Sequence, residues 1–296
     1  MSQSAPGTAA LPLRAALREG IARLSGANVP SASLAAELLL MHTAGCDRAW
    51  LYAHPEHVLL PEQSARYFAL IERRAAGVPT QYLAGKQEFW GFEFEVAPGV
   101  LIPRPETEHV VEVALARLGE TRRNAPIRIA DIGTGSGCIA VALAKELPAA
   151  SLYATDTSAM ALEIARRNAA RHGVADRIQF VECNLLDGVT DSAPFDLIVS
   201  NPPYIATRET ASLPVEVREH EPHAALFAGE DGLEFYPPLI AEAQSRLAPG
   251  GLLVIELGLG QFEPLGDLLD AARGWTRVSA KQDLAGIVRV ISAVKP

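Results

Sequence analysis

From about residue 105 onward, the chain alternates short apolar segments with segments long enough for a helix, and this alternation restricts the possible folds most. Seven segments are strand candidates: residues 127–132, 151–156, 178–182, 197–200, 252–256, 276–281 and 287–291. The first five are separated by helix-length segments, which implies right-handed crossovers and a parallel sheet. The last two lie too close together for a crossover, so we expect a hairpin that adds an antiparallel strand to the sheet of this α/β region.

The N-terminal part of the chain has a helical pattern instead. Apolar residues recur at helical spacing over residues 11–24, and a second helix is expected over residues 34–43, with Ser31 or Ser33 placed to cap it. A third helix is expected over residues 61–77, since a proline opens this segment and a glycine closes it. The sequence therefore predicts a small helical bundle ahead of the α/β region.

The periodicity changes again over residues 87–103, between these two regions. Aromatic residues alternate there in part and Pro98-Gly99 predicts a turn, so this segment is either a hairpin or an extended linker. We accordingly expect a helical domain at 1–85, a hairpin or linker at 86–104, and an α/β domain at 105–296.

Composition limits the class of protein and its range of partners. The chain has 296 residues, of which 49% are hydrophobic and 21% charged, so it is long enough for two domains with sizeable cores. Its net charge of −9 argues against tight sequence-blind binding to DNA or RNA, which needs a basic surface. The same charge is compatible with a protein partner that carries positive patches.

Cysteine usage and the N-terminus point to the compartment. Cys46, Cys138 and Cys183 are far apart and form neither a zinc spacing nor a disulfide framework. The N-terminus lacks the basic and apolar pattern of a signal peptide, and no apolar run approaches the length of a bilayer span. We expect a protein of the reducing cytoplasm that does not contact a membrane.

A glycine-punctuated loop at residues 131–137 follows the first strand candidate and opens a helix. Glycines let the backbone approach a ligand closely, and a helix N-terminus supplies free N–H groups. A dinucleotide fingerprint needs Gly or Ala where this chain has Cys138, so the pattern does not match NAD binding. The Asp-x-Gly-x-Gly-x-Gly form is instead typical of S-adenosylmethionine enzymes. The residues expected to bind this cofactor here are Gly133, Thr134, Gly135, Ser136 and Gly137.

The ends of the next two strand candidates supply further cofactor contacts. Asp156 is placed to hydrogen-bond two ribose hydroxyls, like the acidic residue about 20 residues after the glycines of nucleotide-binding folds. Asn184 and Leu185 are then expected near the adenine ring. The alternative is a purely structural turn, with Asp156 as a helix cap and the other two as ordinary loop residues.

The run Asn201-Pro202-Pro203-Tyr204 directly follows the fourth strand candidate. The prolines fix φ, favour extended geometry and remove two backbone donors, so the segment is rich in acceptors, and Asn201 adds a side-chain carbonyl. Those acceptors match the two N–H bonds of an NH₂ group, and Tyr204 offers a flat face for a planar target. We call Asn201, Pro202, Pro203 and Tyr204 the amide clamp and expect all four to bind the substrate.

Methyl transfer to an amide or aryl amine explains why such a clamp would be needed. The nitrogen of these groups is a weak nucleophile because its lone pair is delocalised, and holding both N–H bonds aims that lone pair at the methyl donor. This reaction requires neither a metal nor a strong general base. We expect Asn201, Pro202 and Tyr204 to act in catalysis and Asn201 also to contact the cofactor, while the alternative is a common Asn-Pro-Pro turn.

Two other groups of polar residues are weaker candidates. Glu106, Glu108, His109 and Glu112 are expected to form the acidic first turns of a helix rather than a metal site. His220, Glu221 and His223 lie in a polar loop, for which we expect no ligand role, and we predict no metal centre.

Several segments together give the chain a resemblance to a known family. They include Gly77-Val78-Pro79-Thr80-Gln81-Tyr82, the run Leu101-Ile102-Pro103-Arg104-Pro105-Glu106-Thr107-Glu108, the glycine loop, the amide clamp with Ile205, Glu221-Pro222, Gly229, Asp231-Gly232-Leu233 and Asp283-Leu284-Ala285-Gly286. On these segments the chain resembles the bacterial peptide chain release factor glutamine methyltransferases. The Leu-Ile-Pro-Arg-Pro-Glu-Thr-Glu run is the most specific of the matches.

The resemblance implies a class I S-adenosylmethionine-dependent methyltransferase domain, Rossmann-like with a mostly parallel seven-stranded sheet, behind a helical domain that recognises the substrate. It implies methylation of the glutamine in the Gly-Gly-Gln motif of release factors one and two, with no direct role for nucleic acid. The family often has tryptophan near the adenine, where this chain has Leu185. The competing interpretation is an enzyme that methylates the exocyclic amine of adenine in DNA or RNA, because such enzymes share the clamp.

Overall fold

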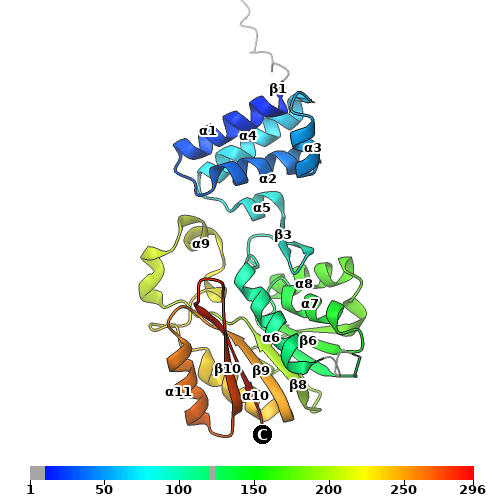
Figure 1. Cartoon of the computed structure of the whole chain (residues 1–296), viewed down its shortest axis with the longest axis vertical. Helices are drawn as coiled ribbons and strands as arrows, with labels where there is room; N and C mark the ends of the chain where they lie inside the picture. Colours follow the sequence, from blue (N-terminus) through cyan, green and yellow to red (C-terminus); the bar gives the residue numbers. More distant parts are fainter. Residues whose placement is uncertain (1–10, 120–123) are drawn as a thin grey trace, which may run out of the picture. The chain divides into compact units, whose positions relative to one another are not determined.

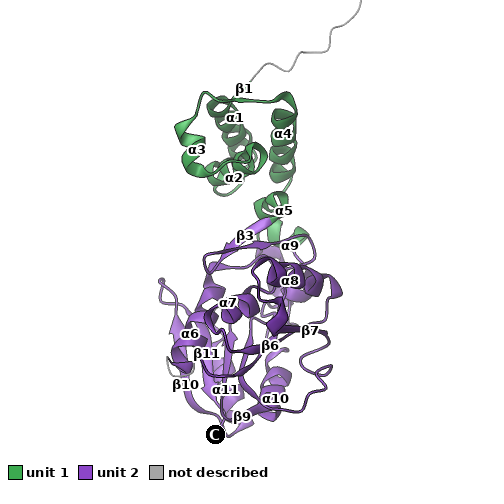
Figure 2. Ribbon diagram, turned by 90° about the vertical axis from the view of Figure 1, so that its right-hand side faces the viewer, with its two compact units in different colours: residues 1–85, 214–220 green, residues 86–213, 221–296 purple. Residues whose placement is uncertain are grey.

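The structure is a computed structural model that describes residues 11–119 and 124–296, so the first ten residues of the expected 1–85 domain lie outside the described residues. It divides into two compact units, coloured separately in Figure 2. Unit 1 contains the described residues up to Gly85 together with Pro214–His220. Unit 2 contains Lys86–Leu213 and Glu221–Pro296.

Unit 1 is a bundle of short helices around its own apolar core. Its elements are α1 (Leu13–Gly26), α2 (Ala32–Ala44), α3 (Arg48–Ala53), α4 (Pro61–Ala75), α5 (Thr80–Ala84), α9 (Val215–His220) and the small pair β1 (Leu11–Pro12) and β2 (Val58–Leu59). Buried side chains from the longer helices meet at Leu13, Leu39 and Tyr67, which are each fully buried. The three expected helices are thus confirmed, whereas α3 and α5, of six and five residues, were not predicted.

Two helix starts in unit 1 differ in how they are capped. Ser31 occupies the N-cap position of α2, but it has a left-handed backbone (φ 51°) and makes no side-chain cap bond, while Ser33 lies inside the helix. The capping prediction was therefore wrong. At α4, by contrast, Pro61 is the first helical residue and the Gln63 side chain accepts a hydrogen bond from the Leu60 N–H at 3.0 Å.

The segment after Gly85 forms a hairpin rather than an extended linker. Strands β3 (Lys86–Phe89) and β4 (Phe92–Glu95) pair antiparallel, and their turn residues Trp90 and Gly91 both have positive φ, as a two-residue turn of this kind requires. Phe89 and Phe94 are fully buried in the core of unit 2. The expected turn at Pro98-Gly99 is present as well, closed by a bond from the Val100 N–H to the Ala97 carbonyl.

Unit 2 contains a seven-stranded sheet with the order β10-β11-β9-β8-β5-β6-β7. The strands are β5 (Arg128–Ile132), β6 (Ser151–Asp156), β7 (Ile178–Glu182), β8 (Phe195–Ser200), β9 (Leu247–Glu256), β10 (Thr276–Gln282) and β11 (Val288–Val294). The first five pair in parallel, whereas β11 pairs antiparallel with β9 and β10. All seven predicted strands and the terminal hairpin are confirmed. The chain order reverses between β5 and β8, which creates a crevice at their carboxyl ends.

Helices cover both faces of this sheet (Figure 1). One face packs against α6 (Glu108–Leu118), α7 (Cys138–Glu146) and α8 (Ala159–Arg171), the other against α10 (Tyr236–Arg246) and α11 (Phe262–Ala272). The result is a three-layer Rossmann-like fold with a mostly parallel seven-stranded sheet, as the resemblance implies. Within the described ranges, no helix is both long enough and apolar enough to cross a membrane.

Candidate active site

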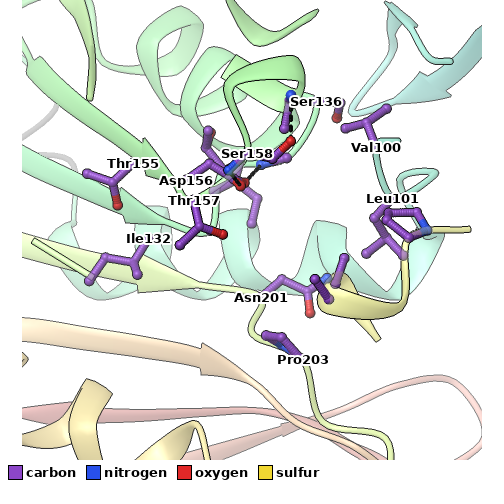
Figure 3. A pocket seen from close by; sticks show the side chains of 18 of the residues that line it. Val100, Leu101, Ile132, Ser136, Thr155, Asp156, Thr157, Ser158, Asn201 and Pro203 are labelled. Atoms are coloured by element: carbon purple, nitrogen blue, oxygen red, sulfur yellow. Dashed lines mark hydrogen bonds between the residues drawn. The ribbon is translucent and has the colours of Figure 1, made fainter. Parts of the chain in front are cut away.

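A pocket opens at the carboxyl edge of the parallel strands, at the crevice beside β5 and β8 (Figure 3). Residues at or directly after the ends of four neighbouring strands line it, namely 133–136 after β5, 156–158 at the end of β6, 183–185 after β7, and Asn201 and Pro203 after β8. Residues 99–101, Pro103, Thr107, Pro222, Ala224 and Ala225 contribute further lining. The glycine loop and the amide clamp, which are far apart in sequence, therefore meet at one pocket.

The glycine loop needs its glycines. Gly133, Gly135 and Gly137 all have positive φ, at 73°, 55° and 80°, where a side chain would be strained. A Cβ on Gly137 would also lie 3.0 Å from the Cβ of Ala165 on α8. The N–H groups of Gly133 and Thr134 both donate to the Thr155 carbonyl at 2.9 Å, which ties the loop to the end of β6.

The side chain of Asp131, near the end of β5, holds the same loop through hydrogen bonds. Its Oδ2 accepts hydrogen bonds from the Thr134 hydroxyl at 2.6 Å and the Ala140 N–H at 3.1 Å. The carboxyl group is fully buried, and desolvation raises its pKa to about 7 despite those two donors. The sequence indicated Asp131 only as the first residue of the glycine motif. Its position at a buried strand end, three residues before a threonine, was the available signal.

Asp156 reaches across from β6 to the loop. Its Oδ2 accepts a bond from the Gly135 N–H and its Oδ1 from the Ser158 N–H, both at 2.9 Å. Burial raises the pKa of this carboxyl group, and backbone N–H donors oppose that effect. The N-cap of α8 is Ser158, which accepts from the Ala161 N–H, so Asp156 does not fill the cap position itself. Each of its oxygens can accept a further bond from a ligand in the pocket.

Asn184 and Leu185 both line the pocket at the end of β7. Leu185 has a left-handed backbone (φ 49°), and its carbonyl accepts a hydrogen bond from the Thr155 hydroxyl at 2.7 Å. The Leu185 side chain is buried against the apolar core below the sheet edge. Because Leu185 also lines the pocket, its contribution to the pocket wall is aliphatic.

Only part of the amide clamp lines the pocket, and the rest packs into the protein core. Of the clamp residues, Asn201 and Pro203 line the pocket, whereas Pro202 and Tyr204 do not. In the glycine loop, Gly137 does not line the pocket either. Tyr204 packs against the core, its hydroxyl donates to Glu256 Oε1 at 3.3 Å, and its carbonyl accepts from Gln261. Burial raises the pKa of Tyr204 well above its ordinary value, so this hydroxyl stays protonated.

The Asn201 side chain is held by a residue that sequence reasoning left without a role. Its Nδ2 donates to the Thr107 hydroxyl at 3.0 Å, across 94 residues of chain. Thr107 ends the 3₁₀ helix η1 (Pro105–Thr107), and it is almost completely buried. The Asn201 carbonyl oxygen, which this bond does not use, remains an acceptor for a substrate NH₂ group.

A second connection ties residues 101–105 to the loop on the far side of the pocket. Glu221, which is 4% exposed, accepts from Arg104 Nη2 at 2.5 Å and from the Ile102 N–H at 3.3 Å. The sequence predicts no ligand role for Glu221, and it did not reveal this structural role. The Leu101–Glu108 run had been recognised only as a family resemblance, whereas the structure shows it packed against the pocket.

Two of the weaker candidates, His109 and Glu112, make ordinary surface contacts. His109 and Glu112 pair on the first turns of α6 at 3.0 Å, and Lys281 also contacts Glu112 at 2.7 Å. Over residues 11–119 and 124–296, no group of three or more His, Cys, Asp or Glu side chains is arranged to hold a metal ion.

Comparison with known proteins agrees with this architecture. The family described as PrmC N-terminal domain matches residues 15–85, and the family described as methyltransferase small domain matches residues 112–217. The chain is 42% identical over 284 residues to the release factor glutamine methyltransferase of Koribacter versatilis, covering 96% of this chain and 99% of that one. It is 45% identical over 283 residues to the enzyme of the same name from Bradyrhizobium diazoefficiens, covering 96% and 95%.

A solved structure shares the fold at lower sequence similarity. A methyltransferase from Pyrococcus furiosus superposes with a TM-score of 0.51 at 20% identity, covering 80% of this chain and 99% of that one.

Proposed function

Because the chain belongs to the family of the release factor glutamine methyltransferases, we propose that it methylates the side-chain amide nitrogen of a glutamine in peptide chain release factors. The methyl donor is S-adenosylmethionine. The acceptor is the glutamine of the Gly-Gly-Gln motif in release factors one and two, and the reaction takes place in the cytoplasm.

The observation that carries the proposal is the meeting of the glycine loop and Asn201 at one pocket. The residues present fit the cofactor, since the loop has no side chain at three positions and exposes its backbone, while Asp156 keeps acceptor capacity for ribose hydroxyls. Asn201 and Pro203 line the same space, so an NH₂ group held there lies beside the cofactor pocket.

The chemistry required of the protein is modest. When bound, S-adenosylmethionine supplies a methyl group on a positively charged sulfur. The Asn201 side-chain carbonyl and the backbone acceptors of Pro202 and Pro203 hold the two N–H bonds of the glutamine amide. They thereby orient its weak lone pair and stabilise positive charge that develops on the nitrogen. One proton leaves the nitrogen as the new C–N bond forms, and S-adenosylhomocysteine is the second product.

Unit 1 is the part proposed to recognise the release factor. It supplies none of the residues that line the pocket. It carries exposed apolar side chains, among them Tyr52 at 60% and Leu60 at 63%, and such residues suit contact with a protein. The net charge of −9 also favours a protein with positive patches over nucleic acid as the macromolecule that binds.

A comparison of acceptors tests this proposal. Purified protein with S-adenosylmethionine is offered folded release factor, a short Gly-Gly-Gln peptide, or adenine-containing DNA and RNA oligonucleotides. We expect the folded factor to have by far the highest kcat/KM, because ordering a flexible glutamine and its glycines has an entropic cost that only remote contacts can offset. Efficient methylation of an oligonucleotide, with the factor left unmodified, would establish the adenine alternative.

A further inference from the structure

The orientation of the Asn201 side chain decides whether the clamp can work. A carboxamide has a carbonyl and an NH₂ group of nearly the same size, and only one orientation offers an acceptor to the substrate. Were the group turned over, two NH₂ groups would face each other and one acceptor would be lost. The Asn201 Nδ2 donates to Thr107 Oγ1 at 3.0 Å, so the acting orientation depends on Thr107.

A threonine hydroxyl alone does not select that orientation, because it can donate as well as accept. It accepts from Asn201 only when its own proton is directed elsewhere. The acceptor that can give it that direction is Glu256, at the end of β9. It is 1% exposed, and burial raises the pKa of its carboxyl group to about 7, an increase that the nearby Thr107 and Tyr204 hydroxyls oppose. Glu256 Oε2 is buried and has no hydrogen-bond partner in the described part of the chain, so it is an acceptor toward which the Thr107 proton can turn.

The same carboxyl group also holds the aromatic member of the clamp. Tyr204 donates its hydroxyl to Glu256 Oε1 at 3.3 Å. Asn201 and Tyr204 both follow β8, whereas Thr107 precedes α6 and Glu256 ends β9. Two residues from other segments, Thr107 and Glu256, therefore each hold one residue of the clamp.

We propose that Thr107 and Glu256 are positioning residues: Glu256 directs the Thr107 hydroxyl, Thr107 fixes the Asn201 carboxamide with its carbonyl oxygen toward the acceptor NH₂ group, and Glu256 also anchors the Tyr204 ring. The inference rests on the proposed function, because it concerns how that function's acceptor is held. It also gives a role to Thr107 of the Leu101–Glu108 run.

Substituting Thr107 with valine tests the central step. Thr107→Val keeps the shape but removes the hydroxyl, so the Asn201 NH₂ group loses its partner and the carboxamide is free to turn over. We expect kcat to fall at least about 10-fold, as leaving a buried polar group unpaired does, while the dissociation constant for S-adenosylhomocysteine changes less than about threefold. Thr107→Ser, which restores the hydroxyl, should recover kcat to within about threefold of the wild type.

A matched control separates this effect from damage to the fold. Thr43 is also a buried threonine, in α2, and its hydroxyl bonds only the Leu39 carbonyl of its own helix. Thr43→Val should leave kcat and cofactor binding unchanged. Glu256→Gln keeps the size of the side chain but replaces an acceptor with a donor, and it should lower kcat in the same selective way.

The outcomes distinguish the inference from the proposed function. Wild-type turnover by Thr107→Val, failure of Thr107→Ser to recover, or an equal loss of cofactor affinity in Thr107→Val would overturn the role of Thr107. Wild-type turnover by Glu256→Gln would overturn that of Glu256. The assay uses whichever NH₂ acceptor the wild-type protein methylates. If the wild-type protein methylates adenine and leaves the release factor unmethylated, the proposed function is contradicted. The variants would then still test the positioning, with adenine as the acceptor.

Discussion

At the scale of single residues, Asp156 is organised before any ligand binds. Two backbone N–H groups, those of Gly135 and Ser158, fix its carboxylate at 2.9 Å each. A ligand hydroxyl therefore meets an acceptor that is already oriented, and little side-chain entropy remains to be lost when it binds. The same bonds mean that Asp156 supports the loop as well as the cofactor.

We predict that Asp156→Ala weakens cofactor binding. Loss of a charged acceptor for ribose hydroxyls should cost roughly 1.5–3 kcal/mol of binding free energy, or about 10- to 150-fold in the dissociation constant. Calorimetry with S-adenosylhomocysteine measures this. The control is Asp176→Ala, at an exposed acid, which should have no effect. An unchanged dissociation constant for Asp156→Ala would reduce this residue to a purely structural role.

Asn201→Ala should show the complementary pattern. The Asn201 carbonyl acts most strongly when charge builds on the acceptor nitrogen, so its loss should slow methyl transfer by about 100- to 1,000-fold and leave cofactor binding nearly intact. Single-turnover kinetics report the transfer step directly. Asn124→Ala, at an exposed loop residue, serves as the control. A rate within tenfold of the wild type would remove Asn201 from the catalytic role.

At the scale of elements, local signals predicted the elements that position the site, and long-range contacts escaped them. The glycine spacing and the prolines after β8 act within a few residues, so the loop and the clamp could be located from sequence. The bonds of Thr107 to Asn201 and of Arg104 to Glu221 join residues 94 and 117 positions apart. No periodicity records such pairs, which is why Arg104 and Thr107 had no predicted role.

The prediction failed at two places in unit 1, the cap at Ser31 and the short helices α3 and α5, because local sequence signals did not determine the structure there. The Ser31 prediction assumed that a serine before a helix caps it, but the left-handed backbone at Ser31 directs its hydroxyl away from that task. The helices α3 and α5 are too short to show a hydrophobic period, and their packing in unit 1 determines them.

The glycine loop supports a prediction for Gly137→Ala. This residue has φ 80°, and a Cβ there would lie 3.0 Å from the Ala165 Cβ and 3.2 Å from its Cα, on α8. We expect a loss of about 1–3 kcal/mol in the free energy of unfolding, measured by denaturant titration, because backbone strain and overpacking add. Gly173→Ala is the control. It shares a positive φ of 68° but would contact nothing within 4 Å, so it isolates the backbone strain. An equal loss in both variants would exclude a packing contribution at Gly137.

At the scale of the whole molecule, the pocket belongs to unit 2, whereas recognition of the release factor is proposed for unit 1. Every residue that lines the pocket belongs to unit 2. The chain enters unit 1 once more at Pro214–His220, where Glu216 pairs with the buried Arg74, and resumes unit 2 at Glu221, which holds Arg104. Glu216 thus pairs within unit 1 and Glu221 within unit 2, and one partner of each ion pair is buried.

A fragment that begins at Lys86 should separate the two activities. It retains all pocket residues, so we expect it to bind S-adenosylhomocysteine with nearly the affinity of the full chain, and this binding also shows that it is folded. Its kcat/KM for folded release factor should fall strongly, because the contacts proposed for unit 1 are missing. Full activity of the folded fragment on intact release factor would contradict the assignment of recognition to unit 1.

The most direct test of the central claim is peptide mapping by mass spectrometry of a release factor after reaction with the protein and S-adenosylmethionine. We predict one added methyl group, located on the glutamine of the Gly-Gly-Gln motif, and none when that glutamine is replaced by alanine. The Asn201→Ala protein should leave the factor unmodified over the same time. A methyl group on another residue, or a factor that stays unmodified with the wild-type protein while cofactor is consumed on a different acceptor, would contradict the account.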